Sequence, residues 1–323
     1  MTFNEEPRPS YARERVHQAG LRRDALKGEY DERPPPARAA EAPCNEVQDT
    51  RYDVGEMRDE AASWRWTGRE REMWIRQVLV GSWLMKMVWP VRVAAWIWRR
   101  LMFRTTFIAI TGSLGKTTSK ELLAAMLKPH GRTYATIGNQ NGPHFVALNI
   151  LRVRPWHRYA VLEVAGAAPG MMQRIAHVVR PDVAVLLTIR RTHSTNFESL
   201  DEHAREKQHL IRGASPRATV VLNGDDPRIA SMATGPRQTV IRFGVSEGSG
   251  IRASGIESAW PGRLAFEARD TRTKARVQTQ LCGDHWLAAA LGALAAAAAG
   301  GIPLEAAAAR AAEAATFSGR LQP

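Results

Sequence analysis

The stretch from Phe107 to Thr118, FIAITGSLGKTT, decides the fold of this chain. Its apolar residues predict a buried strand, its glycines predict a tight turn, and the following SKELLAAML has the pattern of a helix. Such a turn holds phosphate, because glycine lets the backbone wrap closely around the anion and the free N–H groups of the first helical turn point at it. The expected phosphate-binding residues are Gly112, Ser113, Gly115, Lys116, Thr117 and Thr118.

Two of these residues have specific roles in a loop of this kind. Lys116 would place a positive charge between the β- and γ-phosphates, and the Thr117 hydroxyl could bind Mg²⁺. Only two residues separate Gly112 from the Gly115–Lys116 pair, which is shorter than the common P-loop spacing. The alternative is a strand-to-helix turn that merely favours glycine and a helix cap, and the strand–turn–helix context argues against it.

The chain of 323 residues is strongly basic, with a formal net charge of +13 and a pI near 10.5. This charge favours anionic partners such as nucleotides, nucleic acid or anionic lipid. The two cysteines, Cys44 and Cys282, lie far apart in the sequence, so a disulfide framework is not indicated and a reducing compartment is expected. The first 30 residues are polar and charged and do not resemble a signal peptide.

Changes in composition divide the chain into three expected parts. Residues 1–60 are rich in Pro, Arg and Glu without apolar periodicity, so we expect a disordered tail. Residues 61–104 mix tryptophan with Arg and Lys and predict a basic helical segment. Residues 105–323 alternate strand and helix patterns. They predict an α/β domain with a doubly wound, mostly parallel sheet and a small antiparallel extension.

The basic segment 61–104 allows two interpretations. Charged residues and Pro90 interrupt its apolar run, so it matches poorly a transmembrane helix, which needs about 20 apolar residues. Tryptophan beside Arg and Lys suits a helix that lies in the membrane interface. The same pattern suits helices whose tryptophans pack on the following domain.

Polar residues directly after predicted strands are the candidates for chemistry, because ligands of a doubly wound sheet bind beyond the carboxyl ends of its strands. Glu163 ends an apolar strand and could hold Mg²⁺, or could pair with a basic residue. His193 follows the next strand and could face the same crevice, although a lone histidine is more often structural. Lys207 lies on a predicted helix, where a lysine is usually a solvated charge. Asn223 could contact adenine or belong to a turn that caps a helix.

The order of these motifs resembles the central domain of the Mur ligases, the ATP-dependent ligases of peptidoglycan precursor synthesis. The matching motifs, between about Phe107 and Pro323, are TGSLGKTT, GNQNG, LEVAG, HSTNFESLDEHAREK, LNGDDPR, GDH and FSGRLQP. Within the family, the chain looks most similar to the members that add D-alanyl-D-alanine. The resemblance implies that ATP phosphorylates a substrate carboxylate and that an amine then attacks the acyl phosphate to form an amide. Positioning of the reactants and neutralisation of the phosphate charge would supply most of the rate acceleration.

The resemblance also implies a role for each matching residue, with ATP and Mg²⁺ as cofactors. Lys116 and the loop backbone would hold the phosphates, and Thr117 and Glu163 would hold the first Mg²⁺. His193 matches a ligand of the second Mg²⁺, and Lys207 matches the lysine that many members carbamoylate. Lys116, Lys207 and His193 are thus the expected catalytic residues. The other matches are Asn223 to an adenine contact, Asn139 and Asn141 to the loop that faces the substrate, and Arg320 to an arginine near the terminal phosphates.

The chain departs from the family pattern in several places. Leu114 and Ala289 stand where asparagines are usual, and residues 188–193, TIRRTH, lack the usual Asn and Gly. Members of the family also have an N-terminal UDP-binding domain, which is not recognisable here, and a C-terminal domain that follows the motif FSGRLQP. We therefore expect a truncated product, a nucleotide-binding remnant, or one half of a split enzyme that a separate C-terminal ligase domain completes.

The expected function is a Mur-type acid–amino acid ligase in cell-wall peptide synthesis. Its expected partners are a small-molecule carboxylate and an amino-acid or peptide amine. The alternatives are a ligase for another peptide polymer, of cyanophycin or polyglutamate type, and a non-catalytic ATP-binding module at the membrane. Nucleic acid is not expected, because the mixture of Arg and Trp does not resemble a stacking platform on a sheet. The expected location is the cytoplasm, with contact to the inner membrane face through residues 61–104.

Overall fold

The computed structural model describes residues 89–138, 140–191 and 196–314. The predicted tail 1–60 and residues 61–88 of the predicted basic segment lie outside the described residues. The described residues confirm the predicted α/β fold. Its strands are β1 (Thr106–Thr111), β2 (Thr133–Ala135), β3 (Tyr159–Glu163), β4 (Val183–Leu186), β5 (Thr219–Asn223), β6 (Thr239–Gly244), β7 (Ile251–Glu257), β8 (Ala265–Arg269) and β9 (Lys274–Gln278).

These strands form one mixed sheet in the order β2-β3-β1-β4-β5-β6-β7-β8-β9. Neighbouring strands from β2 to β7 pair in parallel, and β7, β8 and β9 pair antiparallel. The predicted antiparallel extension is therefore continuous with the main sheet. β1 lies between β3 and β4, so the phosphate-binding loop that follows it lies next to the carboxyl ends of both neighbours.

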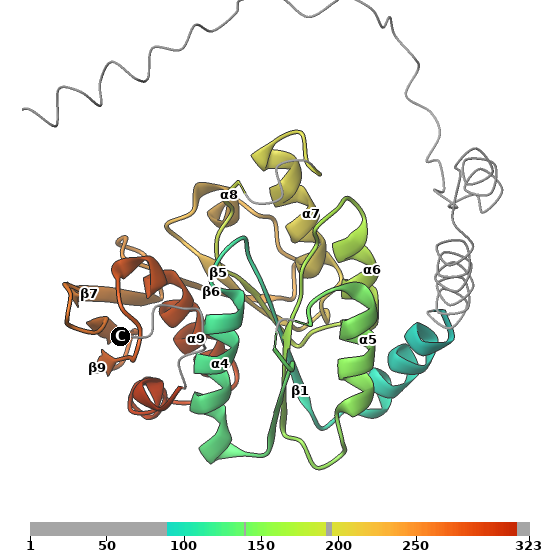
Figure 1. Ribbon diagram of the computed structural model, residues 1–323, viewed down its shortest axis with the longest axis horizontal. Helices are drawn as coiled ribbons and strands as arrows, with labels where there is room; N and C mark the ends of the chain where they lie inside the picture. The colour runs from blue at the N-terminus through green and yellow to red at the C-terminus, as the bar shows by residue number, and fades with distance from the viewer. Residues whose placement is uncertain (1–88, 139, 192–195, 315–323) are drawn as a thin grey trace, which may run out of the picture. The chain divides into compact units, whose positions relative to one another are not determined.

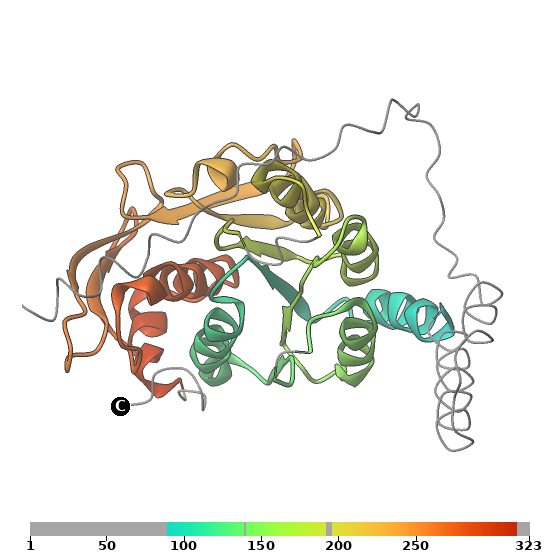
Figure 2. The same ribbon diagram turned by 45° about the horizontal axis from the view of Figure 1, so that its top comes forward.

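Helices cover both faces of the sheet (Figures 1 and 2). The α-helices between the strands and after them are α4 (Lys116–Leu127), α5 (Pro143–Arg152), α6 (Met171–Val179), α7 (Leu200–Arg212), α8 (Pro227–Ala230), α9 (Leu287–Ala299) and α10 (Leu304–Ala308). Short 3-10 turns are η2 (Lys128–His130), η3 (Asp284–Trp286) and η4 (Ala311–Glu313).

The core divides into two main layers because successive side chains of a strand point to opposite faces. Ile108 and Ile110 of β1 pack in the cluster that contains α4, α9 and α10. Phe107 and Ala109 pack in the cluster on the other face, which contains side chains of α5 and α6. The alternation in β1 thus fixes the strand between two helical layers, and the loop after it is held from both sides.

Residues 89–101 form a helix that precedes β1. Ala95 and Met102 are buried in the same cluster as α5 and α6, and Trp98 donates a hydrogen bond from Nε1 to the carbonyl of Val153 at 2.8 Å. One face of this described part of the basic segment therefore packs on the following domain. No helix within the described ranges is long and apolar enough to cross a membrane.

Candidate functional site

The loop between β1 and α4 has a conformation that requires glycine. Gly115 has a φ of 79°, in the left-handed region that side chains disfavour. A Cβ at this position would also lie only 3.0 Å from the Cβ of Ala289 on α9. The small side chain of Ala289 thus lies directly against the loop at Gly115.

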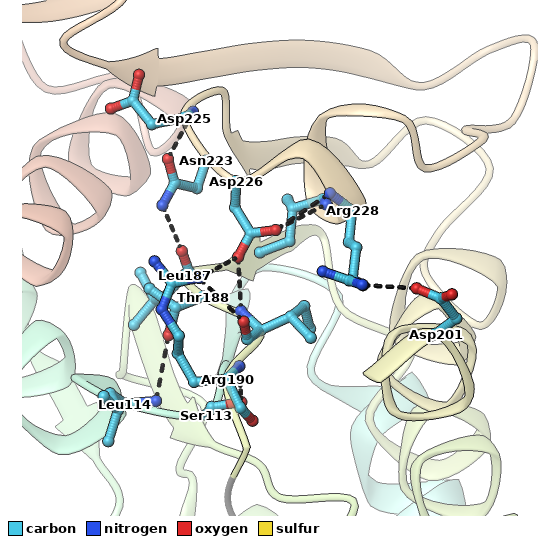
Figure 3. A network of polar contacts seen from close by, with 12 residues as sticks. Ser113, Leu114, Leu187, Thr188, Arg190, Asp201, Asn223, Asp225, Asp226 and Arg228 are labelled. Carbon is cyan, nitrogen blue, oxygen red and sulfur yellow. Dashed lines mark hydrogen bonds and ion pairs between the residues drawn. The ribbon is translucent and has the colours of Figure 1, made fainter. Parts of the chain in front are cut away.

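The same loop is joined to the chain after β4 by four hydrogen bonds (Figure 3). The Ser113 N–H donates to the carbonyl of Thr188 at 2.8 Å, and the Leu114 N–H donates to Thr188 Oγ1 at 3.2 Å. Ser113 Oγ donates to the Arg190 carbonyl at 3.0 Å and accepts from the Arg190 N–H at 2.9 Å. Thr188 and Arg190, the described residues of the departure that make these bonds, therefore lie directly against the phosphate-binding loop.

Lys116 and Thr117 lie where the sequence places them. The Lys116 Nζ donates to the carbonyls of Gly112 at 2.8 Å and Ser113 at 3.2 Å, so its charge lies at the mouth of the loop. Thr117 and Thr118 are buried in the first turn of α4. Lys116 and Thr117 line a cavity of about 660 Å³ at the carboxyl ends of the strands, where a doubly wound sheet binds its ligands.

Glu163 contributes a buried carboxylate to this cavity. It is the last residue of β3 and pairs in register with Ile110 of β1. Its Oε1 accepts a hydrogen bond from Asn141 Nδ2 at 2.8 Å, whereas its buried Oε2 has no hydrogen-bond partner among the described residues. A buried charged oxygen is costly without a partner. Because Mg²⁺ prefers oxygen ligands and is usually held by one or two carboxylates and substrate phosphates, Glu163 and the Thr117 hydroxyl fit this ion.

Lys207 is buried and is not the solvated charge that a helical lysine usually is. Burial lowers the pKa of its amine to about 7; the charge of Lys116 lowers it too, and Glu206 raises it. Glu206 itself accepts hydrogen bonds from the N–H groups of Gly170 at 2.9 Å and Met172 at 2.6 Å, and so caps the start of α6. At neutral pH a large fraction of the Lys207 amine is therefore neutral and nucleophilic, as carbamoylation requires.

Asn223 lies at the cavity wall, but both polar atoms of its side-chain amide already make hydrogen bonds to nearby backbone groups. Its Nδ2 donates to the Leu187 carbonyl at 2.7 Å, and its Oδ1 accepts from the Asp225 N–H at 2.9 Å. Asp226 supplies the cap of α8 by accepting from the Arg228 N–H, and it also accepts from the Ile189 N–H at 2.7 Å. The turn expected from LNGDDPR is thus present, and the adenine contact of Asn223 stays a prediction.

The structure brings most of the predicted site residues to one cavity. Its walls include the predicted residues Ser113, Gly115, Lys116, Thr117, Asn141, Glu163 and Asn223. Gly112 takes part through the carbonyl that binds Lys116. Asn139, His193 and Arg320 lie outside the described residues, so their predicted roles stay predictions.

Two residues at or next to the site, Arg190 and Lys120, were not predicted from the sequence. The Arg190 side chain lines the cavity, and its Nη1 lies 3.7 Å from Asp226 Oδ2. Lys120 is fully buried, and its Nζ donates to the carbonyls of Thr136 and Gly138, both at 2.7 Å, which holds the start of the GNQNG loop. The available signals were the unusual arginines of TIRRTH and the spacing of four residues from Lys116 to Lys120, which puts both on one side of α4.

Comparisons with known proteins agree with this geometry. The family described as Mur ligase middle domain matches residues 110–297. The UDP-N-acetylmuramoyl-tripeptide–D-alanyl-D-alanine ligase of Mycobacterium tuberculosis is 32% identical over 186 residues, which are 58% of this chain and 36% of that protein. The ligase of the same name from Buchnera aphidicola is 31% identical over 215 residues, or 66% of this chain and 46% of that protein.

Solved structures give the same result. MurF from Acinetobacter baumannii superposes with a TM-score of 0.68 and 28% identity, covering 72% of this chain and 51% of that one. The MurF ligase from Thermotoga maritima in complex with ADP has a TM-score of 0.63 and 26% identity, covering 72% and 53%. The chain thus spans about half or less of the length of these relatives. Since the family match covers more than half of its residues, the chain belongs to the Mur ligase family, through the ATP-binding middle domain.

Proposed function

We propose that this protein acts as an ATP-dependent ligase that forms an amide in cell-wall precursor synthesis. By analogy with the relatives named above, its carboxylate substrate is a UDP-N-acetylmuramoyl peptide and its amine is D-alanyl-D-alanine. The observation that carries the proposal is that Lys116 and Glu163 line the same cavity, where the buried Oε2 of Glu163 lacks a hydrogen-bond donor among the described residues. A cation at the loop and an unsatisfied anion beside it fit a magnesium–triphosphate group.

In the proposed reaction, a substrate carboxylate oxygen attacks the γ-phosphorus of ATP, and ADP leaves. The amine then attacks the carbonyl carbon of the acyl phosphate, and phosphate leaves with the formation of the amide and the loss of a proton. The N–H groups at the start of α4 and the Lys116 amine bind and orient the phosphates. Glu163 and Thr117 would hold Mg²⁺, which supplies charge neutralisation to the phosphates when bound.

Lys207 fits a supporting role in this reaction. Its neutral amine can add to CO₂, with formation of an N–C bond and release of one proton, and the product is a carbamate anion. Carbamoylation gives residue 207 a negative charge, and the nearby Lys116, which disfavours the cationic form of Lys207, would favour this anion. A carbamate could then support a second metal, as the family resemblance implies.

We also propose a cytoplasmic site of action. ATP-dependent synthesis of a nucleotide-linked precursor requires the cytoplasmic nucleotide pool. The buried Cys282 is a free thiol, which fits a reducing compartment.

The proposal is tested by ADP release from the full chain with ATP, Mg²⁺, the UDP-N-acetylmuramoyl tripeptide and D-alanyl-D-alanine. ADP release should depend on both the carboxylate and the amine. Lys116→Ala should lower it by about 100-fold or more, because removing one preorganised donor for developing charge has effects of that size. Lys128→Ala, at the exposed end of α4, is the matched control and should leave the rate unchanged. Equal rates of ADP release for Lys116→Ala and the unmodified chain would contradict the assignment of Lys116 to the phosphate-binding site.

A further inference from the structure

The outward face of helix 89–101 is apolar. Pro90, Ala94, Ile97 and Leu101 follow one another at helical spacing, and all four are exposed. The large side chains on and beside this face keep much of their surface accessible: 70% for Trp89, 37% for Trp96, 47% for Ile97, 56% for Leu101 and 83% for Phe103 in the turn that follows. A contiguous apolar patch of this kind marks a surface that contacts something. We call Trp89, Trp96, Ile97, Leu101 and Phe103 the outer face.

The opposite side of the helix fixes the direction of the outer face. Arg99 is buried, and its Nε donates to the Val179 carbonyl at 2.7 Å. Its Nη2 donates to the Arg180 carbonyl at 2.8 Å and to Asp182 Oδ2 at 2.9 Å. With Trp98 bound to Val153 as well, the helix cannot rotate to bury its apolar residues against its own domain.

The surroundings of the outer face are basic. The sequence from residue 73 to residue 120 contains no Asp or Glu, and neither does the stretch 170–181 around α6. Arg92 lies close enough to Arg174 that this like charge adds to burial in lowering the pKa of Arg92. Arg100 stacks over the Trp96 ring at 3.8 Å from its centroid, so a cation accompanies an exposed aromatic ring of the outer face.

A pocket of about 300 Å³ opens at the end of the helix, next to Phe103. Its charged lining consists of Arg99, Arg100, Arg104, Arg180 and Asp182. The single carboxylate already pairs with Arg99 and accepts a hydrogen bond from the Phe107 N–H at 2.9 Å. The guanidinium groups of the exposed Arg104 and Arg180 are therefore placed to bind an anion from outside the protein.

We propose that the outer face rests on a membrane of anionic phospholipid, with the Phe103 and Leu101 side chains among the acyl chains and a lipid phosphate in the arginine pocket. Charge complementarity selects this partner, since an apolar stripe with arginine and tryptophan at its borders matches the anionic, amphipathic boundary of a bilayer. The proposal goes beyond the ligase function. It would hold the cavity of Lys116 near a membrane surface, and it needs no catalysis to be measured.

Sedimentation of the full chain with vesicles tests this interaction. Vesicles of phosphatidylcholine with phosphatidylglycerol should bind the chain, vesicles of phosphatidylcholine alone should bind it weakly, and added salt should release it. The triple variant Ile97→Ser, Leu101→Ser, Phe103→Ser should lower the affinity about tenfold or more, since it removes most of the inserted apolar area. Arg104→Gln should lower it about fivefold, the effect of one basic residue at an anionic surface.

Matched controls lie away from helix 89–101. Ile256→Ser on β7 and Arg237→Gln before β6 change exposed residues of the same types and should bind vesicles like the unmodified chain. Unchanged ADP binding shows that each variant is folded. Three results would overturn the proposal: full vesicle binding by the triple variant, equal binding to neutral and anionic vesicles, or a dimer that the triple variant dissociates without any vesicle binding, since a second copy would then cover this face.

Discussion

Asn141 donates a hydrogen bond from its Nδ2 to Oε1 of Glu163 at 2.8 Å, across 22 residues of sequence. This bond occupies one carboxylate oxygen and orients the other, Oε2, which is buried and has no hydrogen-bond partner among the described residues. The asparagine that was expected to face the substrate thus also supports the residue expected to bind metal. Such supporting hydrogen bonds commonly fix the orientation of metal ligands.

Replacing Glu163 with Gln should weaken the Mg²⁺-dependent part of nucleotide binding. The change keeps the size of the side chain but removes the charge that a hard cation requires. We expect the affinity for ADP in Mg²⁺ to fall about tenfold to 100-fold, and Asn141→Ala, which only frees the carboxylate, to have a smaller effect in the same direction. Isothermal titration calorimetry with Mg²⁺ and with EDTA measures both. An equal loss of affinity in EDTA would contradict the metal role.

Arg190→Gln should lower the affinity for ATP more than the affinity for adenosine. The backbone of Arg190 is hydrogen-bonded to Ser113 of the phosphate-binding loop. Arg190 lines the cavity, and its Nη1 donates to the Ile189 carbonyl at 3.2 Å and lies 3.7 Å from Asp226 Oδ2. A hydrogen bond to a charged group is worth about tenfold in affinity, and the exposure of this side chain makes that an upper value. The matched control is Arg191→Gln, an exposed neighbour outside the cavity wall. Equal losses for ATP and adenosine would show that Arg190 does not act on phosphate.

The lowered pKa of Lys207 should make stability depend on pH. In the folded chain its pKa is about 7, and the ordinary value is 10.5, so between these values the unfolded state binds more protons. The free energy of unfolding that depends on Lys207 therefore rises with pH across this window, and below about pH 7 the buried charge carries its full cost.

Lys207→Met removes this dependence. We expect the variant to be more stable than the unmodified chain at about pH 6, on the order of a few kcal/mol, and to have a flatter stability profile up to about pH 9. Urea unfolding in CO₂-free buffer measures this without interference from carbamate. Lys128→Met, an exposed substitution on the chain after α4, is the control. Parallel profiles for Lys207→Met and the unmodified chain would mean that the amine stays protonated in the fold.

The sequence predicts the sheet and the phosphate-binding loop because both depend on local patterns. The alternation of Phe107 to Ile110 and the glycines after it are enough to place β1 between two helical layers and to open α4 at Lys116. Burial of Lys207 could not be predicted in this way. The helix LDEHAREKQHLIR looks solvated, but Lys207 and Glu206 are both buried, and Glu206 accepts hydrogen bonds from N–H groups at the start of α6, 36 and 34 residues earlier in the chain. Arg190 likewise enters the site through a contact 77 residues away.

The buried Arg99 should contribute more to stability than the exposed Arg104 in the turn after the same helix. Its three hydrogen bonds to Val179, Arg180 and Asp182 tie helix 89–101 to the chain between α6 and β4, and its guanidinium lies 4.1 Å from the centroid of the Phe107 ring. Arg99→Met keeps the apolar packing but leaves the Val179 and Arg180 carbonyls without this donor, and the Asp182 carboxylate keeps only the hydrogen bond from the Phe107 N–H. Because Asp182 is partly exposed, we expect a loss of about 2–4 kcal/mol, toward the lower end for a broken buried pair.

Urea unfolding of Arg99→Met beside Arg104→Met measures this difference, since Arg104 is exposed and its removal should change the free energy of unfolding by less than about 1 kcal/mol. The comparison also bears on the outer face. If the two variants unfold alike, helix 89–101 is not held by Arg99, its outward apolar residues are free to turn toward the domain, and a fixed membrane-facing surface loses its structural basis. If Arg99→Met alone is destabilised, the same three bonds that stabilise the domain also keep Leu101 and Phe103 pointed away from it.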